Sequence, residues 1–170
     1  MLAALFFSSC RKDDIVDTST NPPPAEVFFT ADIIGKIVDQ DGIAIEDATI
    51  TVGNLTESTD VNGLFRWEDL KTGANIGTFL EVKADGYFES GYRIYARGTY
   101  DRTIEITLVR KEISGYVNGS SGDIITLDGG LEIDFPVNAF TSNGGDYNGL
   151  VTIHAYHLDP SDEDYLDRSP

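Results

Sequence analysis

The stretch Thr103-Ile104-Glu105-Ile106-Thr107-Leu108 places an apolar side chain at every second position. Successive side chains of a β-strand point to opposite faces of a sheet, so this alternation predicts a strand with one buried face. The stretch Ala48-Thr49-Ile50-Thr51-Val52 alternates in the same way and ends at Gly53. No part of the chain shows the period of about 3.6 residues that is typical of an amphipathic helix. The sequence therefore predicts an all-β fold.

Segments of this kind recur along the chain at intervals of about 8–12 residues, which is typical of a β-sandwich or a β-barrel. Turn-forming residues separate them, and Asn62-Gly63 is the dipeptide that most strongly indicates a tight hairpin. Further strands are expected at 33–38, 64–67, 79–82 and 92–95, and beyond residue 110 at 114–117, 131–135 and 150–156.

Four motifs between residues 33 and 109 occur in a recognisable order. They are Gly35–Asp39, Gly42–Val52, Ser58–Phe65 and Val82–Tyr87. In their order and spacing they resemble the carboxypeptidase regulatory-like family. The resemblance implies a seven-stranded, transthyretin-like β-sandwich over residues 33–110. It also implies a non-catalytic accessory module, with no peptidase activity of its own.

Residues 111–170 predict a second and smaller β unit. Within it, Gly129–Phe140 followed by Gly149–Ile153 resembles part of the ZU5-like β domains. A unit with so few strands has open edges and little core. Two explanations are open: the unit packs against the first one, or the chain is a fragment of a longer protein.

The N-terminal residues contain the only cysteine of the chain. An apolar run, Leu2–Phe7, is followed by Ser8, Ser9 and Cys10. This arrangement resembles the signal of bacterial lipoproteins, which implies cleavage before Cys10 and lipidation of its thiol. The apolar run is shorter than the 7–15 residues that are typical, so we expect the true start of the protein to lie upstream of Met1.

Residues 11–32 contain many polar residues between Asp13 and Asn21, followed by Pro22-Pro23-Pro24, so they predict a tether between the lipid anchor and the folded part. Lys12-Asp13-Asp14 resembles the surface-export signal of lipoproteins in some Gram-negative bacteria. The expected location is therefore the outer membrane, with exposure on the cell surface as the further expectation. The anchor at Cys10 makes the membrane the first expected partner.

Composition excludes some functions. The 170 residues carry a formal net charge of −17, and no basic patch is available to neutralise the phosphates of a nucleic acid. The sequence lacks the motifs of phosphate-binding loops, dinucleotide-binding folds, zinc peptidases and serine hydrolases. We therefore expect no catalytic residue and no cofactor.

Two clusters could bind a ligand, and both have an ordinary structural explanation. Asp39, Asp41, Asp60 and Asn62 lie in turns and offer the oxygen ligands that calcium prefers, but Asp and Asn are also common turn residues. His154 and His157 are three residues apart, and in a strand such residues face opposite sides, so they cannot share a metal. No metal site is therefore assigned.

Aromatic residues could line a sugar-binding face. The candidates are Tyr87, Phe88, Tyr92, Tyr95 and Tyr100. Aromatic residues are also favoured in strands for their packing, and packing is the default expectation.

The function expected from these features is that of a lipid-anchored, non-enzymatic envelope protein. Its β modules would serve a structural, adhesive or binding role, with a surface polysaccharide or a protein as partner. The main alternative is an accessory region of a larger surface hydrolase whose catalytic domain lies outside this chain. A third candidate, an N-terminal extension of an outer-membrane transporter, is disfavoured because such a protein does not need Cys10.

Overall fold

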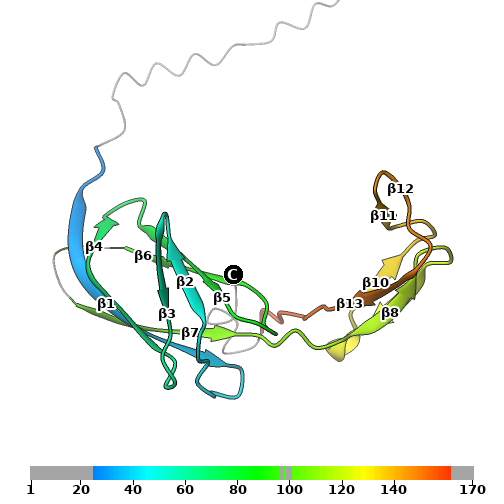
Figure 1. The fold of residues 1–170 in the computed structure, drawn as a ribbon, viewed down its shortest axis with the longest axis horizontal. Helices are drawn as coiled ribbons and strands as arrows, with labels where there is room; N and C mark the ends of the chain where they lie inside the picture. Colours follow the sequence, from blue (N-terminus) through cyan, green and yellow to red (C-terminus); the bar gives the residue numbers. More distant parts are fainter. Residues whose placement is uncertain (1–24, 96–97, 99–100, 162–170) are drawn as a thin grey trace, which may run out of the picture.

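The computed structural model describes residues 25–95, 98 and 101–161 of the chain. The described part contains β-strands and one short 3-10 helix, so the expected all-β fold is confirmed. Figure 1 shows two groups of strands, one formed by β1–β7 and the other by β8–β13. We call residues 28–108 the sandwich and residues 115–153 the distal unit.

The sandwich has two facing sheets. The first has the strand order β4-β1-β7, and the second has the order β3-β2-β5-β6. The strands of the first sheet are β1 (Phe28–Asp39), β4 (Leu64–Gly73) and β7 (Arg102–Leu108). Those of the second are β2 (Thr49–Val52), β3 (Leu55–Ser58), β5 (Thr78–Lys83) and β6 (Ser90–Ile94).

The core lies between these two sheets. It is formed by the apolar side chains that alternate with polar ones along the strands and point inward. Its fully buried side chains include Ile33 and Ile37 from β1, Leu108 from β7, Ile50 from β2 and Leu80 from β5. Burying an aliphatic side chain of this size contributes about 1.5–3 kcal/mol relative to leaving it in water. The alternation in the sequence therefore describes the burial of this half of the chain correctly.

β1 begins earlier than the sequence analysis predicted. Residues 28–32 were assigned to the tether, but they pair with the end of β4, from Phe28 opposite Gly73 to Ala31 opposite Leu70. The polar and proline-rich composition ends before this point, and the buried side chain of Ala31 joins the core. The tether prediction is therefore wrong for 28–32, while residues 11–24 lie outside the described residues.

The Asn62-Gly63 turn is present, but it does not form a hairpin. β3 and β4, on either side of it, belong to different sheets. The turn closes with a hydrogen bond from the amide of Gly63 to the carbonyl of Asp60, at 2.9 Å. Gly63 has φ +72°, and a Cβ there would overlap the carbonyl oxygen of Ile37. The dipeptide thus turns the chain from one sheet to the other.

β1 and β7 are neighbours and run parallel. Their register extends from Ile33 opposite Arg102 to Asp39 opposite Leu108. Parallel strands begin at the same end of a sheet and finish at the other. The chain therefore enters the sandwich at the Phe28 end and leaves it at the opposite end, beside Asp39 (Figure 1).

The distal unit consists of strand pairs. β8 (Gly115–Asn118) pairs with β13 (Leu150–Ile153), β9 (Asp123–Thr126) pairs with β10 (Glu132–Phe135), and β11 (Thr141–Ser142) pairs with β12 (Gly145–Asp146). The short 3-10 helix η1 covers Asp128–Gly130. No strand was predicted at β9, β11 or β12, and the strand predicted at 150–156 extends past the end of β13 at Ile153.

The core of the distal unit is small. Val117 and Ile125 are its buried apolar side chains. The side chain of Ile125 lies against Gly115, where a Cβ would overlap its δ-carbon. The absence of a side chain at this glycine lets β9 approach β8 closely.

Two stretches of chain join the sandwich to the distal unit, and we call them the neck: residues 109–114 lead out and residues 154–159 lead back. The amide of Ser114 donates to the carbonyl of Ile153 at 2.8 Å, and the Ser114 hydroxyl both donates to Ala155 O and accepts from Ala155 N, each at 2.9 Å. The neck is therefore a pair of chains joined by hydrogen bonds.

Candidate functional site

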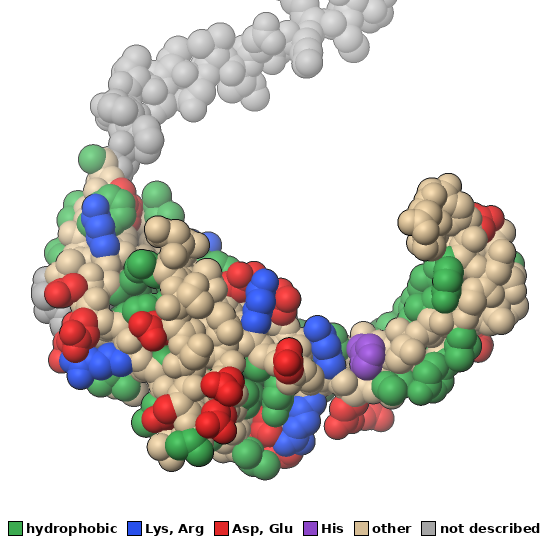
Figure 2. Space-filling view, viewed as in Figure 1, with side chains coloured by type: hydrophobic (Ala, Val, Ile, Leu, Met, Phe, Trp, Pro, Cys, Tyr) green, Lys and Arg blue, Asp and Glu red, His purple; other side chains and the backbone are tan. Residues whose placement is uncertain are grey.

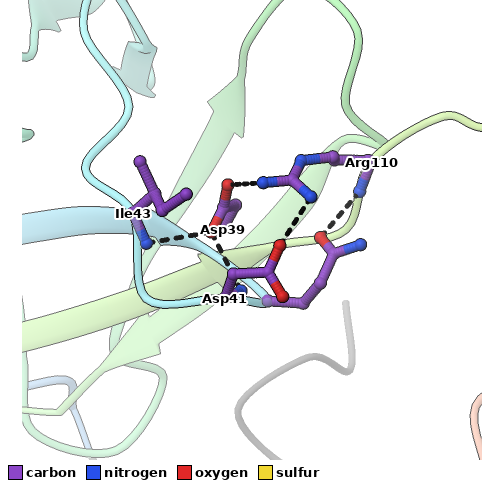
Figure 3. A network of polar contacts seen from close by, with 5 residues as sticks. Asp39, Asp41, Ile43 and Arg110 are labelled. Atoms are coloured by element: carbon purple, nitrogen blue, oxygen red, sulfur yellow. Dashed lines mark hydrogen bonds and ion pairs between the residues drawn. The ribbon is translucent and has the colours of Figure 1, made fainter.

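The point where the chain leaves the sandwich carries a compact polar network (Figure 3). Asp39 ends β1, and Arg110 follows β7. The Arg110 guanidinium donates to the carboxylate of Asp39 and, at 2.6 Å, to that of Asp41. The backbone amide of Arg110 donates to the side-chain oxygen of Gln40 at 3.1 Å. We call Asp39, Gln40, Asp41 and Arg110 the exit clamp.

Asp39 is the buried member of the exit clamp, with 2% of its surface exposed. Its Oδ1 accepts hydrogen bonds from the amides of Asp41 and Ile43, both at 2.9 Å. A buried carboxylate is stable only when its oxygens are paired, and here both oxygens have partners. The carboxylate therefore holds the turn after β1 in shape while it binds Arg110.

The network shifts the ionisation of its members. Burial raises the pKa of the Asp39 carboxyl, but the amides of Ile43 and Asp41, together with Arg110, outweigh burial and hold that pKa below its ordinary value of 3.8. Hydrogen bonds to Asp41, Tyr87 and Asp39 raise the pKa of the Arg110 guanidinium above its ordinary value. Both groups are therefore charged at neutral pH.

The four turn residues considered as calcium ligands lie in two different networks. Asp39 and Asp41 bind Arg110, whereas the Asp60 carboxylate accepts hydrogen bonds from the amides of Asn62 and Leu64 within its own turn. Among the described residues, no group of three or more His, Cys, Asp and Glu side chains could hold a metal ion. These aspartates therefore have structural partners in the turns that they form.

The histidines lie in the returning chain of the neck, outside any strand, so the premise that they share a strand is wrong. His154 Nδ1 is 3.0 Å from the carbonyl oxygen of Glu112 in the outgoing chain. His157 lines a groove between the sandwich and the distal unit. Other side chains of this groove are Gln40, Glu112, Asp128 and Asp159.

The aromatic residues considered for a sugar-binding face lie in different surroundings. Tyr87 packs against the core and forms a bridge with Arg110, while Phe88 lies beneath Lys111, whose Nζ is 5.7 Å from the ring centre. Tyr92 and Tyr95 are exposed near the β6 edge of the second sheet. Tyr100 lies outside the described residues. Of this set, Tyr87 follows the packing explanation, whereas Tyr92 and Tyr95 are exposed.

A second polar attachment holds the end where the chain enters the sandwich. The Glu26 carboxylate accepts hydrogen bonds from the amides of Asn75 at 2.8 Å and Ile76 at 3.1 Å. The amide of Ala74 donates to the carbonyl of Val27 at 2.8 Å. Hydrogen bonds from the backbone of Asn75 are the main cause of a lowered pKa at Glu26. The chain is thus fixed to the β4–β5 turn before β1 starts.

The distal unit has few charges and many exposed apolar side chains. On the face drawn in Figure 2, Lys, Arg, Asp and Glu side chains gather over the sandwich, while the distal unit is mostly apolar or uncharged. Large apolar side chains with more than a third of their surface exposed are Tyr116, Ile124, Leu131, Val137, Tyr147 and Leu150. Clusters of exposed apolar side chains mark contact surfaces in many proteins.

Cys10, the predicted lipidation site, lies outside the described residues. In the part of the chain that the structure describes, no helix is long and apolar enough to span a membrane.

Comparison with known proteins gives partial likenesses in structure. No family model matches the chain, and no curated protein matches it. A protein from Bacteroides fragilis described as membrane-associated is 26% identical, with a TM-score of 0.41 over 56% of this chain and 32% of its own. A 3-chlorocatechol 1,2-dioxygenase from Rhodococcus opacus is 14% identical, with a TM-score of 0.38 over 48% of this chain and 60% of its own. A streptococcal ancillary pilin is 16% identical, with a TM-score of 0.34 over 74% of this chain and 50% of its own. The chain spans less than two thirds of the length of each.

Neither Arg110 nor Glu26 was predicted from the sequence to be a site residue. Arg110 pairs with residues about seventy positions earlier, and Glu26 with an amide about fifty positions later. The one available signal for Arg110 is its position two residues after an alternating strand, in a chain with an excess of acidic residues.

Proposed function

We propose that this chain is a non-catalytic presentation module of the bacterial envelope. In this proposal a lipid on Cys10 attaches the N-terminal end to a membrane, and the sandwich holds the distal unit away from it. The observation that carries the proposal is the parallel pairing of β1 with β7, because it puts the incoming and outgoing ends of the sandwich far apart.

The dimensions and the attachments support this role. β1 has 12 residues, which corresponds to roughly 40 Å at about 3.3 Å per residue. Glu26 fixes the chain at the start of this length, and the exit clamp fixes it at the far end. These contacts support the proposed role of the sandwich as a rigid spacer between the anchor and the distal unit.

The distal unit is the part that meets the partner in this proposal. Its exposed apolar side chains, such as Tyr116 and Leu150, and its low charge suit contact with a protein or with the apolar faces of a polysaccharide. Its two-chain neck limits the directions in which it can point. Presentation on rigid strands therefore supplies the mechanism, without bond chemistry.

The anchor is tested by expressing the chain, extended upstream by a functional lipoprotein signal, in a Gram-negative bacterium. A palmitate analogue should label the parent but leave Cys10→Ala unlabelled, and the variant should move from the membrane to the soluble fraction. Ser9→Ala is the matched control and should behave like the parent. Equal membrane recovery of Cys10→Ala and the parent contradicts the anchor.

A further inference from the structure

We infer that the sandwich is a load-bearing element that resists tension along its length. The inference deepens the proposed function, because a module held at one end and bound at the other experiences a pull between these ends. It follows from the direction of two strands and from the contacts at their ends.

Tension between the two ends acts on β1 and β7 in opposite directions. β1 is pulled by its N-terminal end, at Phe28, and β7 is pulled by its C-terminal end, at Leu108. Because the strands are parallel, these forces slide one strand along the other. In such shear the hydrogen bonds of the whole register, from Ile33 to Asp39, are strained together. If the strands were pulled apart from one end, the bonds would break one after another under a smaller force.

The position of β1 adds to this resistance. It is the central strand of its sheet, paired on one side with β7 and on the other with β4 from Phe28 to Lys36. Sliding β1 therefore breaks two ladders. It also drags Ile33 and Ile37, which have no exposed surface, past the opposite sheet.

The exit clamp lies across the sliding strands. Arg110 belongs to the chain that leaves β7, and Asp39 is the last residue of β1, so shear separates this ion pair directly. Asp39 also accepts the amides of Asp41 and Ile43, so its carboxylate is held in place while Arg110 pulls on it. The exit clamp therefore resists the same displacement as the β1–β7 ladder.

Single-molecule force spectroscopy on the full chain with Cys10→Ala tests the inference without any lipid. Handles attached through Val27→Cys and Lys111→Cys load β1 and β7 in shear. Handles attached through Ile43→Cys and Lys111→Cys lie at the same end of the sandwich and open it from that end. Both sets use exposed positions, and thermal unfolding of each labelled protein shows whether its fold is preserved.

The shear geometry should show one main unfolding event that lengthens the chain by roughly 240 Å. This length is the extended length of residues 28–108 minus the length of β1 in the fold. The force at which this event occurs should be several-fold higher than the unfolding force measured with handles at positions 43 and 111. Phe28→Cys with Glu112→Cys is a second shear pair and should give the same result. Equal forces in the two geometries overturn the inference, while loss of lipidation or of membrane attachment bears only on the proposed function.

Discussion

Arg110 and Asp39 form an ion pair that joins the second residue after the last strand of the sandwich to the last residue of its first strand. The Asp39 side chain is 1% exposed, and that of Arg110 is 33% exposed. The pair fixes the outgoing chain to β1 at the point where the neck begins. Its removal should therefore affect both the stability of the sandwich and the direction of the distal unit.

Replacing the buried carboxylate is the first test of this pair. Asp39→Asn keeps the size of the side chain but turns an acceptor towards Arg110 into a donor. It should lower the free energy of unfolding by roughly 1–3 kcal/mol, since it leaves a buried polar group without its partner. Asp41→Asn, at a largely exposed carboxylate, should cost less than about 1 kcal/mol. Urea unfolding followed by circular dichroism measures both, and equal losses contradict the buried role of Asp39.

The lowered pKa of Asp39 predicts how stability depends on pH. A carboxyl whose pKa is lower in the folded than in the unfolded state stabilises the fold above its unfolded pKa, and this contribution is lost as pH falls through the folded pKa. Between about pH 5 and pH 2 the free energy of unfolding should therefore fall more steeply for the parent than for Asp39→Asn. If the free energy of unfolding fell in parallel with pH for the parent and for Asp39→Asn, the Asp39 carboxyl would have the same pKa in the folded and unfolded states, which would contradict this prediction.

Two glycines with similar backbone angles allow the cost of backbone strain to be measured apart from the cost of steric overlap. Gly42 and Gly63 have φ +76° and +72°, but an added Cβ meets no atom within 4 Å at Gly42 and overlaps the carbonyl oxygen of Ile37 at Gly63. Gly42→Ala should cost about 1–2 kcal/mol for the left-handed backbone alone. Gly63→Ala should cost clearly more. Thermal unfolding of the two variants gives the comparison, and similar losses argue against the close approach of this turn to β1.

The Ser114 hydroxyl makes two of the hydrogen bonds that join the chains of the neck. The Ser114 hydroxyl accepts a hydrogen bond from the amide of Ala155, so Ser114→Ala should expose that amide. A loss of about 1 kcal/mol corresponds to hydrogen exchange at Ala155 that is roughly fivefold faster. Ser120→Ala is the control, because the Ser120 hydroxyl bonds to Asn118 inside the distal unit. Unchanged exchange in Ser114→Ala would show that the Ser114 hydroxyl does not protect the Ala155 amide.

The sequence predicted most of the sandwich because its strands obey local rules. The alternation from Thr103 to Leu108 matches β7, whose residues Ile104, Ile106 and Leu108 are buried. Residues 28–32 were missed because the proline-rich composition before them was extended too far along the chain. The Asn62-Gly63 turn was located correctly, but the partner of each flanking strand depends on contacts that are distant in the sequence.

The candidate site was harder to predict. Asp39 and Asp41 were singled out for their oxygens, but the cation that binds them is the side chain of Arg110, which is remote in the sequence. The histidine pair was misplaced because β13 ends at Ile153, and His154 lies beyond it beside the carbonyl oxygen of Glu112 in the neck. Cys10 lies outside the described residues, and its lipidation stays a prediction.

The height of each part of the protein above a bilayer tests the presentation role most directly. In the lipidated chain on vesicles, a donor fluorophore is attached at Ile76→Cys, beside the start of β1, or at Ser142→Cys in the distal unit, and an acceptor is placed in the lipid headgroups. Both positions are exposed. Presentation predicts that energy transfer to the bilayer is stronger from position 76 than from position 142. Equal transfer, or stronger transfer from position 142, contradicts it.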